Sequence, residues 1–403
     1  MLPSRRSSRP LVEVASAPSR LGHYTPPPMS EQPHLLHVFP SFVPAGSQVR
    51  TAQLIAAFGD EFRHSILALD GRTEARELLG ADTKVRFLPA APKSGSVSTA
   101  LRLRRVLRQE RPDLLLTYNF GSIDALLAAK FCGGWRAVHH EDGFGADEAQ
   151  GFKRRRIWMR RWLLGQTQRL VVISDTLRKI ALEHWNEAPL HMCFIPNGID
   201  IERFAARDGN PPLRHELGIA DDAIVVGAVG HLRAEKNLGR LLEVVARAAR
   251  QGPVAALILG DGPMREELER RASTPALKGR VHFVGHQQDP RPFYRMMDVF
   301  ALTSDTEQMP LSLLEAMSSR LPAVATNVGD VVAMLPGEQA PFVALPGGES
   351  CLESLAASLG RLAADPLLRA RLGDKNFERV RKHYSQRAMI DAYLGVYRQA
   401  LAR

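Results

Sequence analysis

The 403-residue chain has few cysteines and no long apolar run, and both shortages exclude whole classes of protein. Its three cysteines, Cys132, Cys193 and Cys351, lie far apart and form no C-x-x-C pair. This argues against a disulfide framework or a zinc site and fits a reducing cytosol. No apolar run approaches the ~18 residues of a membrane-spanning helix. Residues 1–28 lack the apolar core of a secretory signal. We therefore expect a cytoplasmic protein with a disordered, basic and Pro-rich tail over residues 1–32, and Met29 is a second candidate start.

The balance of charge points to anionic partners. The chain carries 53 Lys and Arg against 43 Asp and Glu, a net charge of +10. Nucleotide phosphate, anionic lipid and nucleic acid are the candidate partners. No recognised nucleic-acid module appears, so we expect no nucleic-acid binding.

Strand and helix patterns alternate through two successive halves of the chain. Apolar segments such as 34–39, 114–118 and 223–229 are typical of buried strands, and the first strand of each half leads into a glycine-bearing loop. The alternation predicts an α/β fold of two Rossmann-like, doubly wound domains facing a cleft. We expect an N-terminal domain over 33–195, a linker over 196–212, and a C-terminal domain over 213–383. A last helix over 384–403 should pack back towards the first domain.

The stretch 303–317 has the pattern of a strand end, a loop and a helix start. The apolar run 299–302 precedes it, and Pro310 suits the first turn of a helix. Such a helix end attracts phosphate through its unpaired N–H groups. Glu307 and Glu315 stand eight positions apart beside it, and carboxylates are natural acceptors for vicinal hydroxyl groups. A nucleotide sugar has hydroxyls at both ends and phosphates between them. Two Glu at this spacing also occur in ordinary helices, one capping and one solvated.

Taken with I-P-N-G-I-D at 195–200 and L-G-D-G-P at 259–263, this pattern resembles the retaining glycosyltransferases of family 4, which have the GT-B fold. The resemblance covers nearly everything from about residue 35 to the C-terminus. It implies that the second domain holds a nucleotide-diphosphate sugar and that the first binds the acceptor. It also implies that Glu307 contacts the sugar and Glu315 the ribose.

The resemblance extends to other donor-binding positions, with departures. Lys236 stands at the family's diphosphate-binding lysine, but the usual arginine is replaced by His231, so Arg233 is our candidate for a second cation. The family's glycine and aromatic after the first Glu are Gln308 and Met309 here, which puts the choice of sugar in doubt. The remaining candidates implied for the donor are Gly46 in the first glycine loop, Gly285 near the base, and Pro310 and Leu311 at the helix start.

The segment 136–143 ends a strand where the family places a histidine near the reacting sugar. His139, His140, Glu141 and Asp142 compete for this role, and the two histidines cannot both face the cleft because strands alternate faces. With Glu307, we take His140 and Asp142 as the catalytic candidates. No D-x-D triplet occurs, which argues against a metal-dependent GT-A enzyme, so we expect no metal and no cofactor.

Two basic stretches, 102–111 and 153–162, lie in the first domain. The second interleaves cations with Trp158 and Trp162, the composition of an interfacial helix, although a solvated basic face explains it equally well. We hypothesise peripheral association with an anionic membrane and a lipid-linked saccharide acceptor. A same-fold epimerase or phosphorylase and a non-catalytic nucleotide-sugar-binding partner remain alternatives. A dinucleotide-dependent oxidoreductase is disfavoured because no G-x-G-x-x-G follows the first strand.

Overall fold

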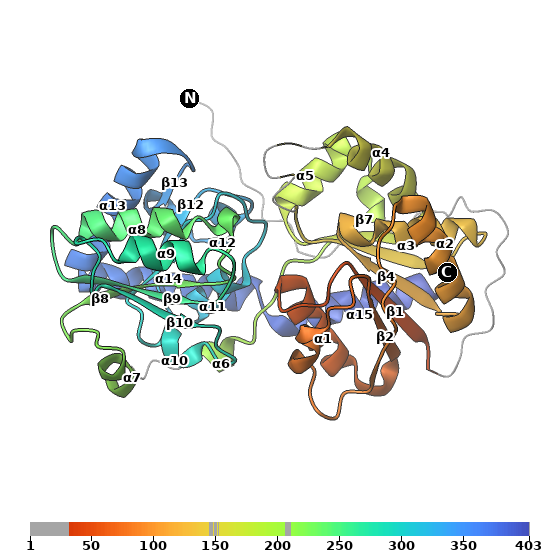
Figure 1. Ribbon diagram of the computed structural model, residues 1–403, viewed down its shortest axis with the longest axis horizontal. Coiled ribbons are helices and arrows are strands. Elements are labelled where there is room, and N and C mark those ends of the chain that lie inside the picture. Colours follow the sequence, from red (N-terminus) through yellow and green to blue (C-terminus); the bar gives the residue numbers. More distant parts are fainter. Residues whose placement is uncertain (1–31, 145–147, 149–150, 152, 206–210, 403) are drawn as a thin grey trace.

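The computed structural model describes residues 32–144, 148, 151, 153–205 and 211–402 as two α/β domains lying side by side (Figure 1). The expected tail lies outside these residues except for Gln32. Each domain is built on one all-parallel sheet, with strand order β3-β2-β1-β4-β5-β6-β7 in the first and β10-β9-β8-β11-β12-β13 in the second. The predicted α/β class with two doubly wound domains is therefore confirmed.

The first sheet is buried on both faces, which explains its nearly continuous apolar strands. In order across the sheet, the strands are β3 (Val85–Phe87), β2 (Arg63–Ala68), β1 (His34–Phe39), β4 (Leu114–Tyr118), β5 (Ala137–Glu141), β6 (Arg169–Val172) and β7 (Met192–Phe194). In the register, Leu35 of β1 lies between His64 of β2 and Leu114 of β4.

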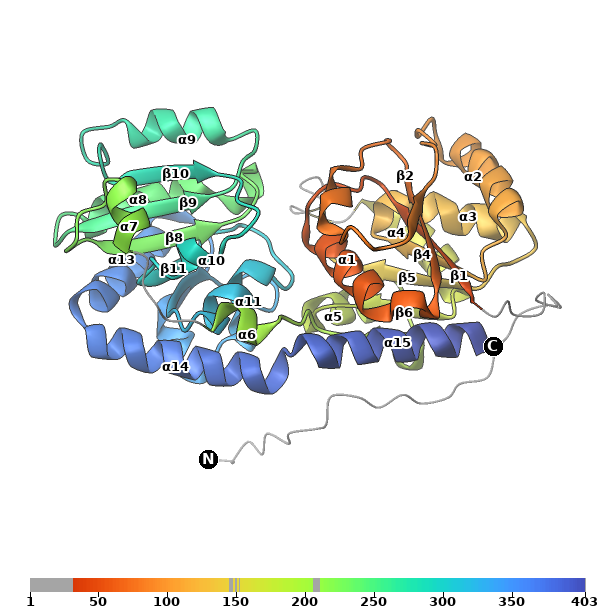
Figure 2. The same cartoon turned by 90° about the horizontal axis from the view of Figure 1, so that it is seen from below.

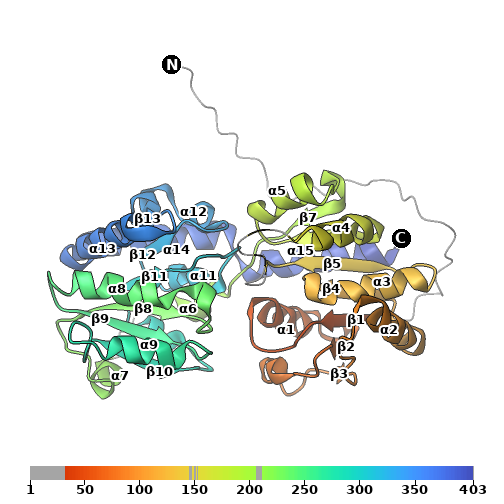
Figure 3. The ribbon, with the colours of Figure 1, turned by 45° about the horizontal axis from the view of Figure 1, so that its top comes forward.

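Helices cover both faces of this sheet (Figure 3). One face packs against α1 (Gly46–Phe58) and α15 (Gln386–Ala402). The other packs against α2 (Ser96–Glu110), α3 (Ile123–Phe131), α4 (Arg154–Leu163) and α5 (Asp175–His184). The last helix, expected over 384–403, begins two residues later, because end residues contribute little to an apolar pattern.

The second sheet is likewise covered on both faces. Its strands are β10 (Val281–Gly285), β9 (Val254–Leu259), β8 (Ile224–Val229), β11 (Val299–Leu302), β12 (Ala323–Thr326) and β13 (Val343–Ala344). One face packs against α8 (Leu238–Ala248), α9 (Arg265–Ala272) and α13 (Gly348–Ala364). The other packs against α10 (Arg291–Tyr294), α11 (Leu311–Ser318) and α14 (Pro366–His383). The shorter helices of this half are α6 (Ile201–Phe204), α7 (Pro211–Glu216) and α12 (Val331–Met334).

Short 3-10 turns join several of these elements. They are η1 (Gly59–Glu61), η2 (Glu74–Leu78), η3 (Phe120–Ser122), η4 (Leu164–Gln166), η5 (Pro189–His191), η6 (Ala234–Lys236) and η7 (Gly337–Phe342). Within the expected linker, α6 packs on α11 of the second domain, so this part of the segment is not a free connector.

The chain crosses between the domains twice, and the two crossings pair with each other. From below, α14 runs under the second domain and α15 continues under the first (Figure 2). The Ile199 N–H donates to the Tyr384 carbonyl at 2.9 Å, and the Gln386 N–H donates to the Ile199 carbonyl at 3.0 Å. A Cβ at Gly198 would lie 2.6 Å from the Ser385 carbonyl oxygen. The I-P-N-G-I-D motif thus contains glycine because two backbones touch there. Among the described residues, no helix is long and apolar enough to cross a bilayer.

Candidate active site

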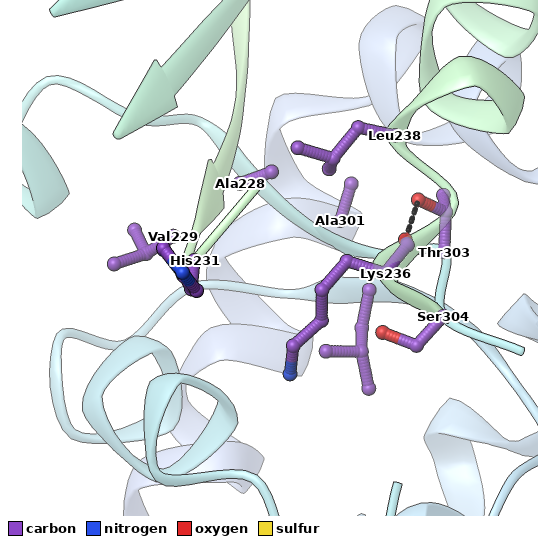
Figure 4. Close-up of a pocket in the computed structure, with 10 residues that line it drawn as sticks. Ala228, Val229, His231, Lys236, Leu238, Ala301, Thr303 and Ser304 are labelled. Atoms are coloured by element: carbon purple, nitrogen blue, oxygen red, sulfur yellow. Dashed lines mark hydrogen bonds between the residues drawn. The ribbon is translucent and has the colours of Figure 1, made fainter. Parts of the chain in front are cut away.

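A pocket lies at the carboxyl ends of β8 and β11, where the strand order of the second sheet reverses. Doubly wound sheets bind ligands at this switch point. Its walls come from the end of β8 with the following loop, and from the end of β11 with the next two residues; they are Ala228, Val229, Gly230, His231, Lys236, Leu238, Ala301, Leu302, Thr303 and Ser304. In Figure 4 the Lys236 side chain lies beside Ser304, and His231 lies on the opposite side.

Lys236 and Glu307 form an ion pair at this pocket. The Lys236 Nζ donates to Glu307 Oε1 at 2.5 Å, and the Ser304 hydroxyl donates to the same oxygen at 2.8 Å. The loop beneath them is fixed because Arg240 donates to the Thr303 carbonyl at 2.7 Å. The predicted phosphate-binding cation and the predicted sugar-contacting carboxylate are therefore direct neighbours.

The start of α11 lies next to this pair. Pro310 is its N-cap residue, and a Cβ at Gly46 of α1 would lie 3.9 Å from the Leu311 Cδ1 atom. The N-termini of α1 and α11, one from each domain, thus meet at the junction. Gly329 has φ of +53° and lies so close beneath the Glu307 and Gln308 carbonyls that a Cβ would overlap them. This glycine allows the Glu307 loop to take its shape.

Glu315 lies one turn further along α11. Its Oε2 accepts a hydrogen bond from the Tyr294 hydroxyl at 2.7 Å. Burial raises the pKa of Glu315, and the Tyr294 hydrogen bond and the nearby Arg203 charge oppose that rise. The pKa of this partly buried carboxyl is therefore raised overall, while Tyr294 and Arg203 limit the rise.

The L-G-D-G-P motif supports the pocket through its backbone. The Leu232 N–H donates to the Asp261 carbonyl at 2.9 Å, and a Cβ at Gly262 would lie 2.6 Å from the Leu232 carbonyl oxygen. Gly260 has φ of +130°, and its N–H donates to the Gly285 carbonyl on the neighbouring strand at 2.8 Å. Gly285, predicted to lie near the base, therefore belongs to the same edge of the sheet.

The two candidate cations differ in position. Lys236 lines the pocket, as does His231, which the sequence reasoning had set aside. Arg233 has a side chain that is 45% exposed and lies 3.9 Å from Glu235. In this structure Arg233 does not line the pocket, because its backbone is held by the turn that precedes η6.

His140 does not face the junction, and this corrects the expectation for it. The side chain is 1% exposed, its Nδ1 donates to the Thr117 carbonyl at 3.0 Å, and its Nε2 lies 3.0 Å from the Tyr397 hydroxyl of α15. His139, on the other face of β5, is also fully buried and contacts Thr117 and Glu141. Both rings are core groups because helices cover both faces of the sheet, a feature that strand alternation alone could not reveal.

Asp142, by contrast, lies at the junction. Its carboxylate pairs with the buried Arg50 of α1 at 2.5 Å, and Arg50 also donates to the Asn197 side chain at 3.0 Å. Asn197 in turn donates to the Met309 carbonyl at 2.9 Å. A chain of contacts thus joins a predicted catalytic group to the loop that carries Glu307.

Three further contacts join the domains around Gln308. The Ser174 hydroxyl donates to Gln308 Oε1 at 2.9 Å. The Asp330 carboxylate accepts from the backbone N–H groups of Asp175 at 2.6 Å and Thr176 at 3.0 Å, so it caps α5 of the opposite domain. The sequence reasoning missed Asp330, Asn197 and Tyr294. A polar residue following a predicted strand was the available signal for Asp330.

No group of three or more potential metal ligands occurs within the part of the chain that the structure describes. The absence of a metal requirement remains a prediction.

Comparison with known proteins agrees with this geometry. Residues 223–365 match the family model "Glycosyl transferases group 1", and residues 45–198 match "Glycosyl transferase 4-like domain". The chain belongs to the group 1 glycosyltransferases. The two matched regions correspond to the two domains seen in the structure.

Individual relatives agree. The lipopolysaccharide core biosynthesis glycosyltransferase LpsE of Rhizobium meliloti is 34% identical over 182 residues, covering 45% of this chain and about half, 52%, of that relative. The UDP-Gal:alpha-D-GlcNAc-diphosphoundecaprenol alpha-1,3-galactosyltransferase of Escherichia coli is 28% identical over 268 residues, covering 61% of this chain and 67% of that relative. The crystal structure of Anabaena Alr3699/HepE in complex with UDP and glucose superposes with a TM-score of 0.78 at 18% identity, covering 91% of this chain and 100% of that one. This last likeness confirms the GT-B fold.

Proposed function

We propose that this glycosyltransferase moves a sugar from a nucleotide-diphosphate sugar to a saccharide or lipid-linked saccharide, with retention at the anomeric carbon. The observation that carries the proposal is the Lys236–Glu307 pair at the start of α11, at the switch point of the second sheet. A cation and a helix N-terminus suit a diphosphate, and the adjacent carboxylate suits sugar hydroxyls.

The chemistry follows from these groups. The bond between the anomeric carbon and the diphosphate oxygen breaks, and its electron pair leaves with the diphosphate. Lys236 and the first N–H groups of α11 stabilise the charge that develops there. The acceptor hydroxyl oxygen forms the new bond and gives its proton to the departing diphosphate. No metal is needed in this scheme, and no protein nucleophile is assigned.

Uridine diphosphate sugars are the first donors to test, since a relative is named for UDP-Gal and a structural neighbour contains UDP. The assay follows release of uridine diphosphate with and without a lipid-linked or free saccharide acceptor. Release that requires an acceptor supports transfer. Interconversion of the sugar nucleotide without an acceptor would indicate an epimerase, and binding without turnover a non-catalytic partner. Glu307→Gln should abolish acceptor-dependent release while uridine diphosphate still binds.

A basic and aromatic surface on α2, α3 and α4 supports a lipid-linked acceptor. Trp158 is 60% exposed and Trp162 is 40% exposed, and their rings stack with centroids 5.4 Å apart. Val97 and Leu101 of α2 are also exposed. Neither tryptophan is therefore part of the core of the first domain. We call the exposed side chains Val97, Leu101, Arg154, Arg155, Trp158, Arg161 and Trp162, with the half-buried Lys130 that lies 4.0 Å from the Trp162 ring, the aromatic-basic surface.

Not every cation of α4 contributes to this surface. Arg160 is fully buried, and its guanidinium donates to Glu141 at 2.7 Å and to Glu148 at 3.3 Å. Arg154, Arg155 and Arg161 are exposed. Each well-placed cation near an anionic leaflet contributes about 1 kcal/mol. We infer that this surface holds the first domain against an anionic membrane.

Vesicle co-sedimentation tests this inference. The protein should bind vesicles rich in phosphatidylglycerol at low salt and should not bind phosphatidylcholine vesicles. Changing Arg154, Arg155 and Arg161 to Glu should abolish binding. Changing Arg371, Arg381 and Lys382, exposed on α14, to Glu is the matched control and should have a much smaller effect. Equal loss in both variants would show that overall charge, not this surface, governs binding.

A further inference from the structure

We propose that Tyr294 is a positioning residue for the nucleotide ribose: its hydroxyl holds Oε2 of Glu315 and so orients the carboxylate to accept a ribose hydroxyl at its other oxygen. The inference rests on the proposed function, and it takes Glu315 as the ribose-contacting group, the role that the family resemblance implies for it. It adds a residue from α10 that does not itself touch the donor in this scheme.

The geometry fixes the direction of the Tyr294 hydroxyl. The residue is fully buried, with its ring centroid 5.8 Å from that of Phe204 in α6 and 6.2 Å from that of Phe300 in β11. From this position the hydroxyl lies 2.7 Å from Glu315 Oε2 and 3.2 Å from the Ser312 carbonyl oxygen. A ring packed by two aromatic neighbours cannot swing away, so the hydrogen bond to Glu315 is pre-formed.

The hydrogen bond leaves capacity for the ligand. A carboxylate has two oxygens and about four lone-pair sites. Tyr294 uses Oε2 of Glu315. Oε1 can therefore accept from a ribose hydroxyl, and the carboxylate is already held at one orientation before the nucleotide arrives. Such pre-orientation reduces the entropic cost of binding.

Few charges face Glu315 from the elements packed around it. Arg203 of α6 is the cation that lowers its pKa, whereas burial raises it. From α14, Asp374 pairs with Arg320 beyond the far end of α11, at 2.8 Å. From α10, the remaining ionisable contact is Tyr294 itself. Tyr294 and Arg203 thus oppose protonation of a partly buried acid.

Removing the Tyr294 hydroxyl oxygen alone should therefore weaken nucleotide binding in a pH-dependent way. Tyr294→Phe keeps the packed ring but removes the donor to Glu315. The carboxylate then loses its fixed orientation, and its pKa rises further because burial is less opposed. As the pH falls, a larger fraction of Glu315 becomes protonated, and the acceptor for the ribose hydroxyl weakens.

The experiment measures the Kd of uridine diphosphate and of 2′,3′-dideoxyuridine diphosphate by calorimetry between pH 6 and pH 8. For Tyr294→Phe we expect about a tenfold higher Kd for uridine diphosphate at pH 6, with a smaller effect at pH 8. The dideoxy nucleotide should bind the variant and the wild type alike. Tyr384→Phe, which removes a hydroxyl just after α14 that lies 3.5 Å from the Ala333 carbonyl oxygen, is the control.

A double-mutant cycle separates the inference from the proposed function. If Tyr294 acts through Glu315, adding Tyr294→Phe to Glu315→Gln should cause little further loss of affinity. If Glu315→Gln alone leaves uridine diphosphate binding unchanged, Glu315 does not contact the ribose, whether or not sugar transfer occurs. If Glu315→Gln weakens binding but Tyr294→Phe does not, or if Tyr294→Phe weakens the dideoxy nucleotide equally, the positioning role is overturned.

Discussion

Acid should destabilise the first domain because its core holds neutral histidines. The His37 Nε2 and His64 Nδ1 atoms lie 3.0 Å apart, and His37 Nδ1 lies 2.8 Å from the Tyr118 hydroxyl. Burial lowers the pKa of His64 to about 4 and lowers the pKa of His37 and His140 well below the ordinary value. Protonating these rings would break the hydrogen bonds that require one nitrogen to accept.

The sign and size follow from linkage. A histidine that titrates near 6.5 when unfolded and near 4 when folded contributes its full stability above pH 6.5, and this is lost as the pH falls towards 4. Between pH 7 and pH 5 such a residue loses about 1.8 kcal/mol, since each pKa unit corresponds to about 1.4 kcal/mol. His37 and His140 lose stability in the same direction, because burial lowers their pKa values as well. Because domains are stable by only about 5–15 kcal/mol, the loss from His64 alone is already a substantial part of the stability.

Tryptophan fluorescence isolates this effect, because all four tryptophans, Trp135, Trp158, Trp162 and Trp185, lie in the first domain. In urea titrations, the fluorescence midpoint should fall sharply from pH 7 to pH 5, and His64→Gln should reduce that fall. Equal fluorescence midpoints at the two pH values would refute the reasoning, since the histidines would then titrate without cost in the folded domain.

Two further predictions concern the second domain. Lys236→Ala should reduce turnover more than Arg233→Ala, because Lys236 lines the pocket and pairs with Glu307 while Arg233 is half exposed. Steady-state rates with a uridine diphosphate sugar measure this. A larger loss for Arg233→Ala would show that the diphosphate site has been assigned to the wrong residues. Gly260→Ala should lower the melting temperature by several degrees, because its Cβ would overlap the backbone of the neighbouring loop at φ of +130°. Gly252→Ala, with nothing within 4 Å, is the control and should melt close to the wild type.

The sequence predicted the fold well because both sheets are buried on both faces, so nearly every strand is a distinct apolar run. Local pattern and family resemblance also singled out Glu307 and Lys236, which the structure brings into contact, and their roles stay predictions. It failed for His140, because the ring's environment is set by α15, which lies more than 240 residues away in the sequence and covers that face of the sheet. Strand alternation gives two faces but not which helix covers each of them. Long-range packing decides that.

The same limit explains why Asp330, Asn197 and Tyr294 were missed. Each acts on a residue far away in the sequence: Asp330 on the start of α5, Asn197 on Met309, and Tyr294 on Glu315. The motif around Asn197 was found, but its glycine was explained only when the pairing with the segment before α15 was seen. A motif shows that a backbone constraint exists, whereas the structure shows which two segments create it.

The departures from the family pattern at Gln308 and Met309 have a physical role in this chain. The Gln308 side chain accepts from Ser174 of the first domain at 2.9 Å, and the Met309 Sδ accepts from the Asn197 N–H at 3.1 Å. The loop that presents Glu307 is therefore also a main contact between the domains. Because these hydrogen bonds are buried, shifting one domain against the other must either break them or carry the loop along. The position of Glu307 is thus coupled to the domain arrangement, so contacts made by the acceptor-binding domain help to set the geometry of the donor site.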